Sequence, residues 1–121
     1  LEEKNNSYLK APSGGSLVQH SLVAMLEMVE QGIFTYEMVV EEMCHAPAKL
    51  FQIKDRGFIR PGYKADLTLV APNQSWTVSE DNILYKCGWS PFTGMLMTGR
   101  VQRVVLRGQE VVRDGIVLNY R

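Results

Sequence analysis

The chain of 121 residues has the length of one compact domain, and its hydrophobic share of 45% is that of a folded protein rather than a disordered one. Thirteen Lys and Arg balance thirteen Asp and Glu, so neither nucleic acid nor an anionic membrane is indicated as a partner. No apolar run reaches the roughly 18 residues of a membrane span, and no signal peptide opens the sequence. We expect a cytoplasmic protein whose partner is a small molecule or another protein surface.

A loop followed by an amphipathic helix is predicted at the start of the chain. Residues 1–16 are polar and rich in turn formers, with a proline and two glycines close to the end of the segment. Apolar side chains then recur with a helical period, at positions 18, 22, 25, 26 and 29. We expect Ser16 to cap this helix and Gly32 to end it.

Two further helices are predicted before the pattern changes. Thr35 precedes a run with a glutamate in its first turn, which favours a helix that begins at Tyr36 and continues to about His45. Pro47 lacks a backbone N–H and does not suit the interior of that helix, but it suits the first turn of a new one. We therefore expect a separate short helix over residues 47–51.

Strands are predicted for the second half of the chain. Residues 66–70 form an apolar run in which we expect a buried strand. Three β-branched runs close the sequence, at residues 101–106, 109–112 and 116–118. The dipeptides between these runs, Arg107-Gly108 and Asp114-Gly115, favour tight turns, so the last fifth of the chain is predicted to be a β-meander.

The side chains that most often bind metals or act as nucleophiles are few and scattered. His20 and His45 are the only histidines, and neither has a second ligand at i+2 or i+4, so we expect both to be structural. Cys44 and Cys87 lack C-x-x-C spacing and are predicted to be buried free thiols in a reducing cytosol. Asp66 stands where a strand begins and is expected to accept backbone hydrogen bonds.

Residues 57–70 carry a family resemblance. They fit the pattern G-x-I-x-x-G-x-x-A-D-L, which resembles the amidohydrolase superfamily segment that leads from a metal-bearing barrel into a small β-sandwich. The preceding residues 46–51 are similar to the family's N-P-A-K helix. Ala46 stands where Asn is usual, which removes a capping side chain worth about 1 kcal/mol of local stability.

Further stretches resemble dihydroorotases in particular. The run S-P-F-T-G at residues 90–94 and the V-x-x-G-x-x-V pattern after it are similar to the end of those enzymes. At the start, E-E-K-N followed by A-P-S-G at residues 11–14 is similar to the stretch after the D-H-A-P-H motif of class I dihydroorotases. Ser13 stands where phenylalanine is common in that stretch.

The resemblance implies an α/β fold class and a division of the chain into two parts. Residues 1–54 are expected to be the last loop and helices of a TIM barrel, and residues 55–121 the C-terminal part of a small β-sandwich. The chain is then a fragment of a longer zinc hydrolase that interconverts N-carbamoyl-aspartate and dihydroorotate in pyrimidine biosynthesis. It is expected to supply no catalytic residue and no metal ligand, and to be inactive alone.

The Pro12–Gly15 segment is the candidate substrate-binding loop. It precedes a helix start, where free N–H groups favour anions, but it lacks the lysine and the spacing of a phosphate-binding P-loop. The resemblance implies that backbone groups of Ser13 and Gly14 hold the carboxylate or ring amide of dihydroorotate. A flexible connector is the alternative interpretation of the same composition.

Three interpretations of the function stay open. The first is part of a dihydroorotase, and the second is a non-catalytic dihydroorotase-like scaffold subunit. The third is a related cyclic amidohydrolase that acts on hydantoin, dihydropyrimidine or allantoin; the run at residues 90–94 favours dihydroorotate over these. The expected partners are the small-molecule substrate and the rest of the parent chain, and a homo-oligomeric parent is compatible with the resemblance.

Overall fold

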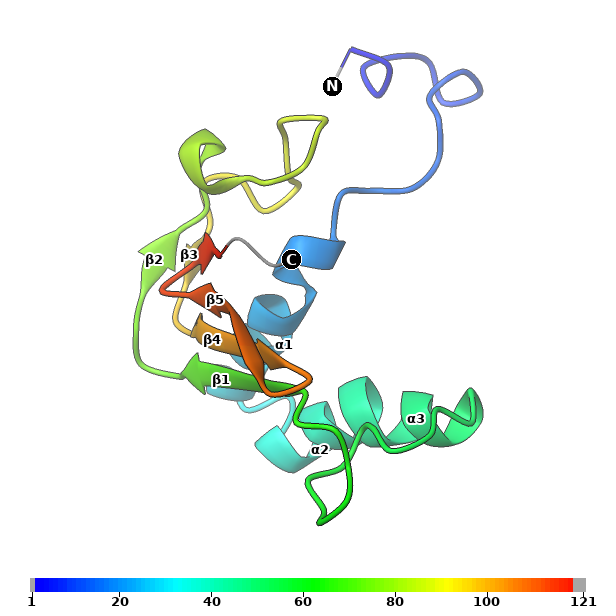
Figure 1. The fold of residues 1–121 in the computed structure, drawn as a ribbon. Helices are drawn as coiled ribbons and strands as arrows, with labels where there is room; N and C mark the ends of the chain where they lie inside the picture. The colour runs from blue at the N-terminus through cyan, green and yellow to red at the C-terminus, as the bar shows by residue number, and fades with distance from the viewer. Residues whose placement is uncertain (1, 119–121) are drawn as a thin grey trace.

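Helices occupy the first half of the chain and strands the second half, as predicted (Figure 1). This computed structural model describes residues 2–118, so residue 1 and residues 119–121 of the predicted two parts lie outside the described residues. The helical elements are η1 (Val18–His20), α1 (Ser21–Glu30), α2 (Tyr36–Val40), η2 (Glu41–His45), α3 (Ala46–Leu50) and η3 (Glu80–Asn82). The strands are β1 (Leu67–Ala71), β2 (Trp76–Thr77), β3 (Leu96–Met97), β4 (Arg100–Leu106), β5 (Gln109–Arg113) and β6 (Ile116–Val117).

The first helix begins without the predicted side-chain cap. Leu17 occupies the N-cap position of the 3₁₀ turn η1, and no side chain caps it. The hydroxyl of Ser16 donates instead to the carbonyl of Trp89, at 2.8 Å. The prediction of Ser16 as N-cap is wrong because the helix starts one residue later and the hydroxyl bonds a distant segment. Gly32, with φ of +72°, ends the helix as predicted.

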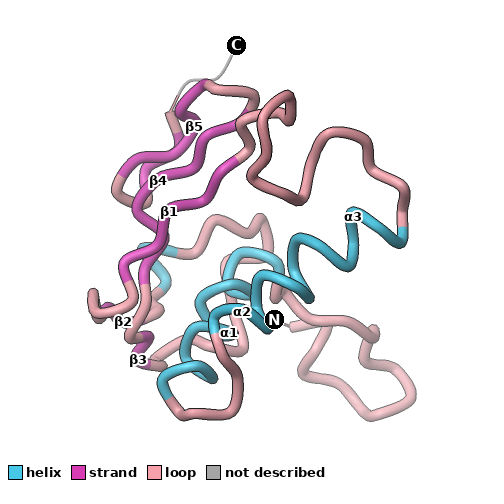
Figure 2. The backbone as a smooth tube through the Cα atoms, turned by 90° about the horizontal axis from the view of Figure 1, so that it is seen from below, coloured by secondary structure: helices cyan, strands magenta, loops and turns pink. Residues whose placement is uncertain are grey.

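The second and third predicted helices form one continuous helical run (Figure 2). Thr35 caps its start, since the hydroxyl accepts a hydrogen bond from the Met38 N–H at 3.3 Å. The prediction of a separate helix at Pro47 is wrong because a π-helical turn, η2, joins α2 to α3. There the Ala46 N–H donates to the Glu41 carbonyl five residues back. The wider turn shifts the backbone hydrogen bonds by one residue just before Pro47. Pro47 has no N–H to donate, and the helix continues through it.

The main sheet is antiparallel, with the strand order β1-β4-β5-β6, and β2 and β3 form a separate pair. Two-residue turns connect β4 to β5 and β5 to β6. Arg107 and Gly108 have φ of 52° and 80°, and Asp114 and Gly115 have φ of 51° and 81°. Positive φ at both central residues is the geometry of type I′ hairpins. The predicted β-meander is therefore confirmed.

The start of β1 is fixed to the turn between β4 and β5. Asp66 accepts a hydrogen bond from the Arg107 N–H at 2.6 Å and pairs with the guanidinium of Arg56, so its predicted structural role is confirmed. The prediction of a buried strand is wrong, because Leu69 is 46% exposed and Thr68 is exposed too. These two residues are consecutive and point to opposite faces of β1, so neither face of the strand is completely covered in the described chain.

The hydrophobic core is small. The buried hydrophobic residues in the described chain are Val23, Leu26, Val39, Ala48, Val78 and Met97. Val23, Val78 and Met97 form one cluster, and the residues packed against it are Trp76, Ile83, Phe92 and Val101. Trp76 and Phe92 thus pack against the core. The indole N–H of Trp76 also donates to the Gly99 carbonyl at 2.9 Å, which satisfies its polar atom inside the core.

A cavity of about 720 Å³ lies between the first helix and the main sheet. One cross-strand row of paired residues lines it, namely Thr68, Val104, Val112 and Val117. Residues of η1 and α1 line it as well, among them Gln19, Leu22 and Val23. Figure 1 shows α1 behind the sheet, and the cavity is where helix and sheet meet without filling the space between them.

Candidate functional site

The predicted substrate-binding loop folds around a lysine. Ser13 and Gly14 are exposed, and neither lines the cavity. The Lys4 ammonium donates hydrogen bonds to three successive carbonyls, those of Pro12, Ser13 and Gly14. The carbonyl and the N–H of one trans peptide group point in opposite directions. The N–H groups of Ser13, Gly14 and Gly15 therefore point away from the lysine.

This arrangement suits an anionic or carbonyl ligand. The three carbonyls converge on one ammonium, so the opposite N–H groups diverge, and each is free to meet an acceptor on the outer side of the loop. The loop also leads into a helix start whose free N–H groups carry partial positive charge. Gly14 has φ of +85°, and no atom lies within 4 Å of where a Cβ would stand. The loop therefore depends on glycine for its backbone conformation rather than for close packing.

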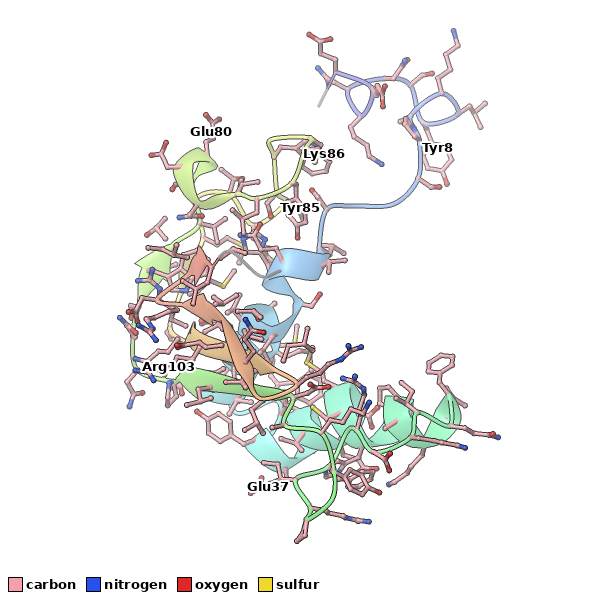
Figure 3. All side chains as sticks on the ribbon, viewed as in Figure 1. Tyr8, Glu37, Glu80, Tyr85, Lys86 and Arg103 are labelled. Carbon is pink, nitrogen blue, oxygen red and sulfur yellow. The ribbon has the colours of Figure 1, made fainter. Side chains whose placement is uncertain are left out.

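Gln19 connects the helix start to a distant segment by three hydrogen bonds. Its backbone N–H donates to the Tyr85 hydroxyl at 2.6 Å. Its side-chain amide donates to the Asn82 carbonyl at 2.7 Å and accepts from the Leu84 N–H at 2.8 Å. Figure 3 shows Tyr85 pointing from its loop toward the start of the first helix. Sequence reasoning missed Gln19, because its partners lie more than sixty positions away.

His20 is completely buried within a ring of aromatic side chains. Its Nδ1 lies 3.2 Å from the Ser90 hydroxyl oxygen. The ring stacks on Trp76 with centroids 6.1 Å apart and meets Tyr85 and Phe92 edge-on at 5.9 and 5.8 Å. Within residues 2–118 the Nε2 atom has no hydrogen-bond partner. Burial lowers the pKa of His20, since desolvation disfavours the charged imidazolium.

His45 lies in a second, more exposed cluster on the helical run. Its ring stacks on Phe58 with centroids 4.3 Å apart, and its Nδ1 lies 2.9 Å from a carboxylate oxygen of Glu41. The other oxygen of Glu41 lies 2.8 Å from the Lys49 ammonium. Hydrogen bonds from Lys49 and then His45 hold the pKa of Glu41 below its usual value. These contacts fasten the turn after α3 to the helix, as expected of a structural histidine.

The cysteines are free, but the prediction that they are buried is wrong. Cys44 and Cys87 are both exposed thiols. Cys44 lies in the π-helical turn and Cys87 in the loop after η3. Within the described chain both side chains are in contact with solvent. Thiols at such positions are open to oxidation in air, and a reducing buffer is appropriate for any measurement.

No metal centre is formed within residues 2–118. No group of three or more His, Cys, Asp or Glu side chains in this range lies close enough together to hold a metal ion. Zinc sites need three or four converging N, O or S ligands, so the donor set of the described residues does not fit zinc. In the same part of the chain, no helix combines the length and the apolar character that crossing a bilayer requires.

The order of helices and strands can be compared with known protein families. Helices that lead through the turn segment 57–66 into an antiparallel sheet form a short α/β unit. The amidohydrolase family model matches residues 10–111, which is most of the chain. The chain belongs to the amidohydrolase family.

Relatives and solved structures within this family are similar over most of the chain. The dihydroorotase of Geobacter metallireducens is 34% identical over 113 residues, which cover 93% of this chain and 26% of that relative. The dihydroorotase of Pyrococcus furiosus is 34% identical over 94 residues, with coverages of 78% and 22%. The structure of L-hydantoinase from Arthrobacter aurescens matches with a TM-score of 0.84 and 35% identity, covering 92% of this chain and 25% of that one. The chain spans about a quarter of the length of these proteins.

Proposed function

We propose that this chain is the C-terminal part of a cytoplasmic dihydroorotase, a zinc hydrolase that interconverts N-carbamoyl-aspartate and dihydroorotate in pyrimidine biosynthesis. The observation that carries the proposal is the 34% identity to the Geobacter metallireducens dihydroorotase over 93% of the chain. In this proposal residues 1–54 complete the barrel and residues 55–121 belong to the β-sandwich. The metal ligands and the catalytic Asp come from the rest of the parent chain, because residues 2–118 hold no such cluster.

The role proposed for this chain is to hold the substrate through the Pro12–Gly15 loop. Dihydroorotate carries a carboxylate and a ring amide, and both offer oxygen atoms to N–H donors. The N–H groups of Ser13 and Gly14 point away from Lys4, which holds the carbonyls on the other side. Donors fixed in this way bind an oxyanion without first reorganising, which favours a low KM.

A hydantoinase or dihydropyrimidinase is the second candidate, and the L-hydantoinase structure at 35% identity favours it. The two candidates differ in the substrate. Unsubstituted hydantoin and dihydrouracil have the cyclic amide but lack the carboxylate of dihydroorotate, so a loop that binds the carboxylate discriminates against them. A non-catalytic dihydroorotase-like scaffold is the third candidate, and it predicts a parent protein without the zinc cluster.

One set of measurements on the complete parent protein separates these candidates. The protein is purified in a reducing buffer, its zinc content is measured, and the hydrolysis of dihydroorotate, hydantoin and dihydrouracil is compared. Zinc together with a higher kcat/KM for dihydroorotate supports the proposal. A higher kcat/KM for hydantoin or dihydrouracil supports the second candidate. Absence of both zinc and turnover supports the scaffold.

A further inference from the structure

The Pro12–Gly15 loop has few attachments to the folded body on its N-terminal side. Tyr8 and Leu9 are 95% and 92% exposed, and Figures 1 and 3 show the first residues of the chain standing apart from the helices and the sheet. Lys4 ties the loop only to its own segment. Within residues 2–118, the loop is therefore joined to the body through the residues directly after Gly15.

Those residues are held by a set of contacts that we call the clasp. The clasp joins residues 16–20 to residues 82–90 through the hydrogen bond of Ser16, the three hydrogen bonds of Gln19 and the contact of His20 with Ser90. The side-chain amide of Gln19 bonds a carbonyl and an N–H of the same extended stretch. Only a side chain with both a donor and an acceptor makes this pair, so glutamate and leucine cannot replace it.

The far side of the clasp is itself fixed to the core. Asn82 and Ser79 form a capping box on η3, and the next residue toward the core, Val78, is buried at 1% exposure. Ser90 is buried and its hydroxyl accepts a hydrogen bond from the Phe92 N–H at 3.3 Å. The clasp therefore connects residues 16–20, which directly follow the loop, to a segment that packs against the hydrophobic core.

We infer that Gln19 is a positioning residue for substrate binding, which holds the Pro12–Gly15 loop in place through the clasp without touching the substrate. This inference rests on the proposed function for the part that concerns substrate. It predicts a split in the kinetics. A loosened loop has to be ordered when the substrate binds, so the KM rises while the chemical step, performed elsewhere, changes little.

The test compares Gln19→Ala, Gln19→Glu and the control Gln102→Ala in the complete enzyme. Gln102 also bonds through its side-chain amide, but its partner is the exposed side chain of Gln74, away from the clasp. Gln19→Ala is expected to raise the KM for dihydroorotate about tenfold, the loss expected for two hydrogen bonds, with kcat within about twofold of wild type. Gln19→Glu keeps the size of the side chain and the acceptor for Leu84, but it replaces the donor with a carboxylate oxygen that repels the Asn82 carbonyl, so it disrupts the clasp without leaving a cavity.

A second readout does not depend on activity. Trypsin cleavage after Lys10, followed by mass spectrometry, reports the mobility of the segment that carries the loop. The Gln19 variants are expected to be cut severalfold faster than wild type and Gln102→Ala at the wild-type rate. Unchanged cleavage in both Gln19 variants, or a raised KM without faster cleavage, overturns the inference. If wild type does not turn over dihydroorotate, the proposed function fails, while the cleavage rates still decide whether the clasp positions the loop.

Discussion

The imidazole of His20 and the hydroxyl of Ser90, seventy positions apart in the sequence, lie 3.2 Å from each other and are both buried. This contact joins the helix start to the segment between η3 and β3 at the centre of an aromatic cluster. A neutral imidazole fits such surroundings, whereas an imidazolium there loses its hydration without gaining an anionic partner. The stability of the helix start is thus linked to the protonation of one side chain.

The first prediction is a loss of stability in acid that depends on His20. Burial lowers the pKa of His20 in the folded state, so the unfolded state binds the proton more tightly. The stabilisation is complete above the ordinary histidine pKa of about 6.5 and is lost as the pH falls from there toward the folded-state pKa. Thermal unfolding of the complete protein between pH 5 and pH 8 is expected to show this decrease, and His20→Gln is expected to flatten it.

The matched control for this prediction is His45→Gln. His45 is partly exposed and pairs with Glu41, so its removal leaves the His20 environment intact. The variant is expected to keep the decrease between pH 6.5 and the folded-state pKa. An equally flat profile in both variants, or an unchanged profile in His20→Gln, would show that His20 does not carry the effect.

The second prediction concerns Gly57. A Cβ at this position would stand 2.4 Å from the Ala48 Cβ and 2.7 Å from the Cys44 carbonyl oxygen, and the residue has φ of +78°. Gly57→Ala therefore forces the segment away from the helical run and is expected to destabilise the protein by more than about 2 kcal/mol.

Gly62 is the control, since its φ is +84° but no atom lies within 4 Å of its Cβ position. Gly62→Ala is expected to cost about 1 kcal/mol, from backbone strain alone. Urea midpoints of the complete protein measure both, and equal shifts would contradict the steric argument.

The third prediction tests the backbone nature of the substrate contact. Ser13→Ala in the complete enzyme is expected to leave the KM for dihydroorotate within about twofold of wild type, because the peptide N–H remains. Gly14→Val is expected to raise the KM about tenfold or more, since a β-branched residue is strained at φ of +85° and displaces the donors. Steady-state kinetics of the two variants decide the matter. Near-wild-type values for both would identify the loop as a connector.

The fourth prediction concerns the 121-residue chain in isolation. Its helical run and the following turn expose large apolar side chains, among them Leu50 at 74%, Phe51 at 72% and Ile59 at 90%. Apolar side chains gathered in this way favour association or dye binding in water. The isolated chain is expected to bind a hydrophobic dye strongly or to form oligomers in light scattering. A monomer with weak dye binding and a sharp, cooperative melt would contradict this expectation.

Local sequence determined the elements whose conformation depends on near neighbours. Arg107-Gly108 and Asp114-Gly115 specify type I′ turns because their backbone conformations need residues that tolerate positive φ. Thr35 and Gly32 mark helix ends for equally local reasons. The family motifs at residues 57–70 and 90–94 are also contiguous, and the family match bears them out. The candidate loop at residues 12–15 is located from another contiguous run, A-P-S-G at residues 11–14.

Only the tertiary structure decided how that loop is held. Serine is a common helix cap, yet the hydroxyl of Ser16 donates to the carbonyl of Trp89. Glutamine is common at exposed helix positions, yet the side-chain amide of Gln19 donates to the carbonyl of Asn82. Each partner lies more than sixty positions away, and no local preference indicates such a pair. Polar side chains satisfy whichever partner the packing of the core brings within reach, so their roles emerge only when distant segments have been assembled.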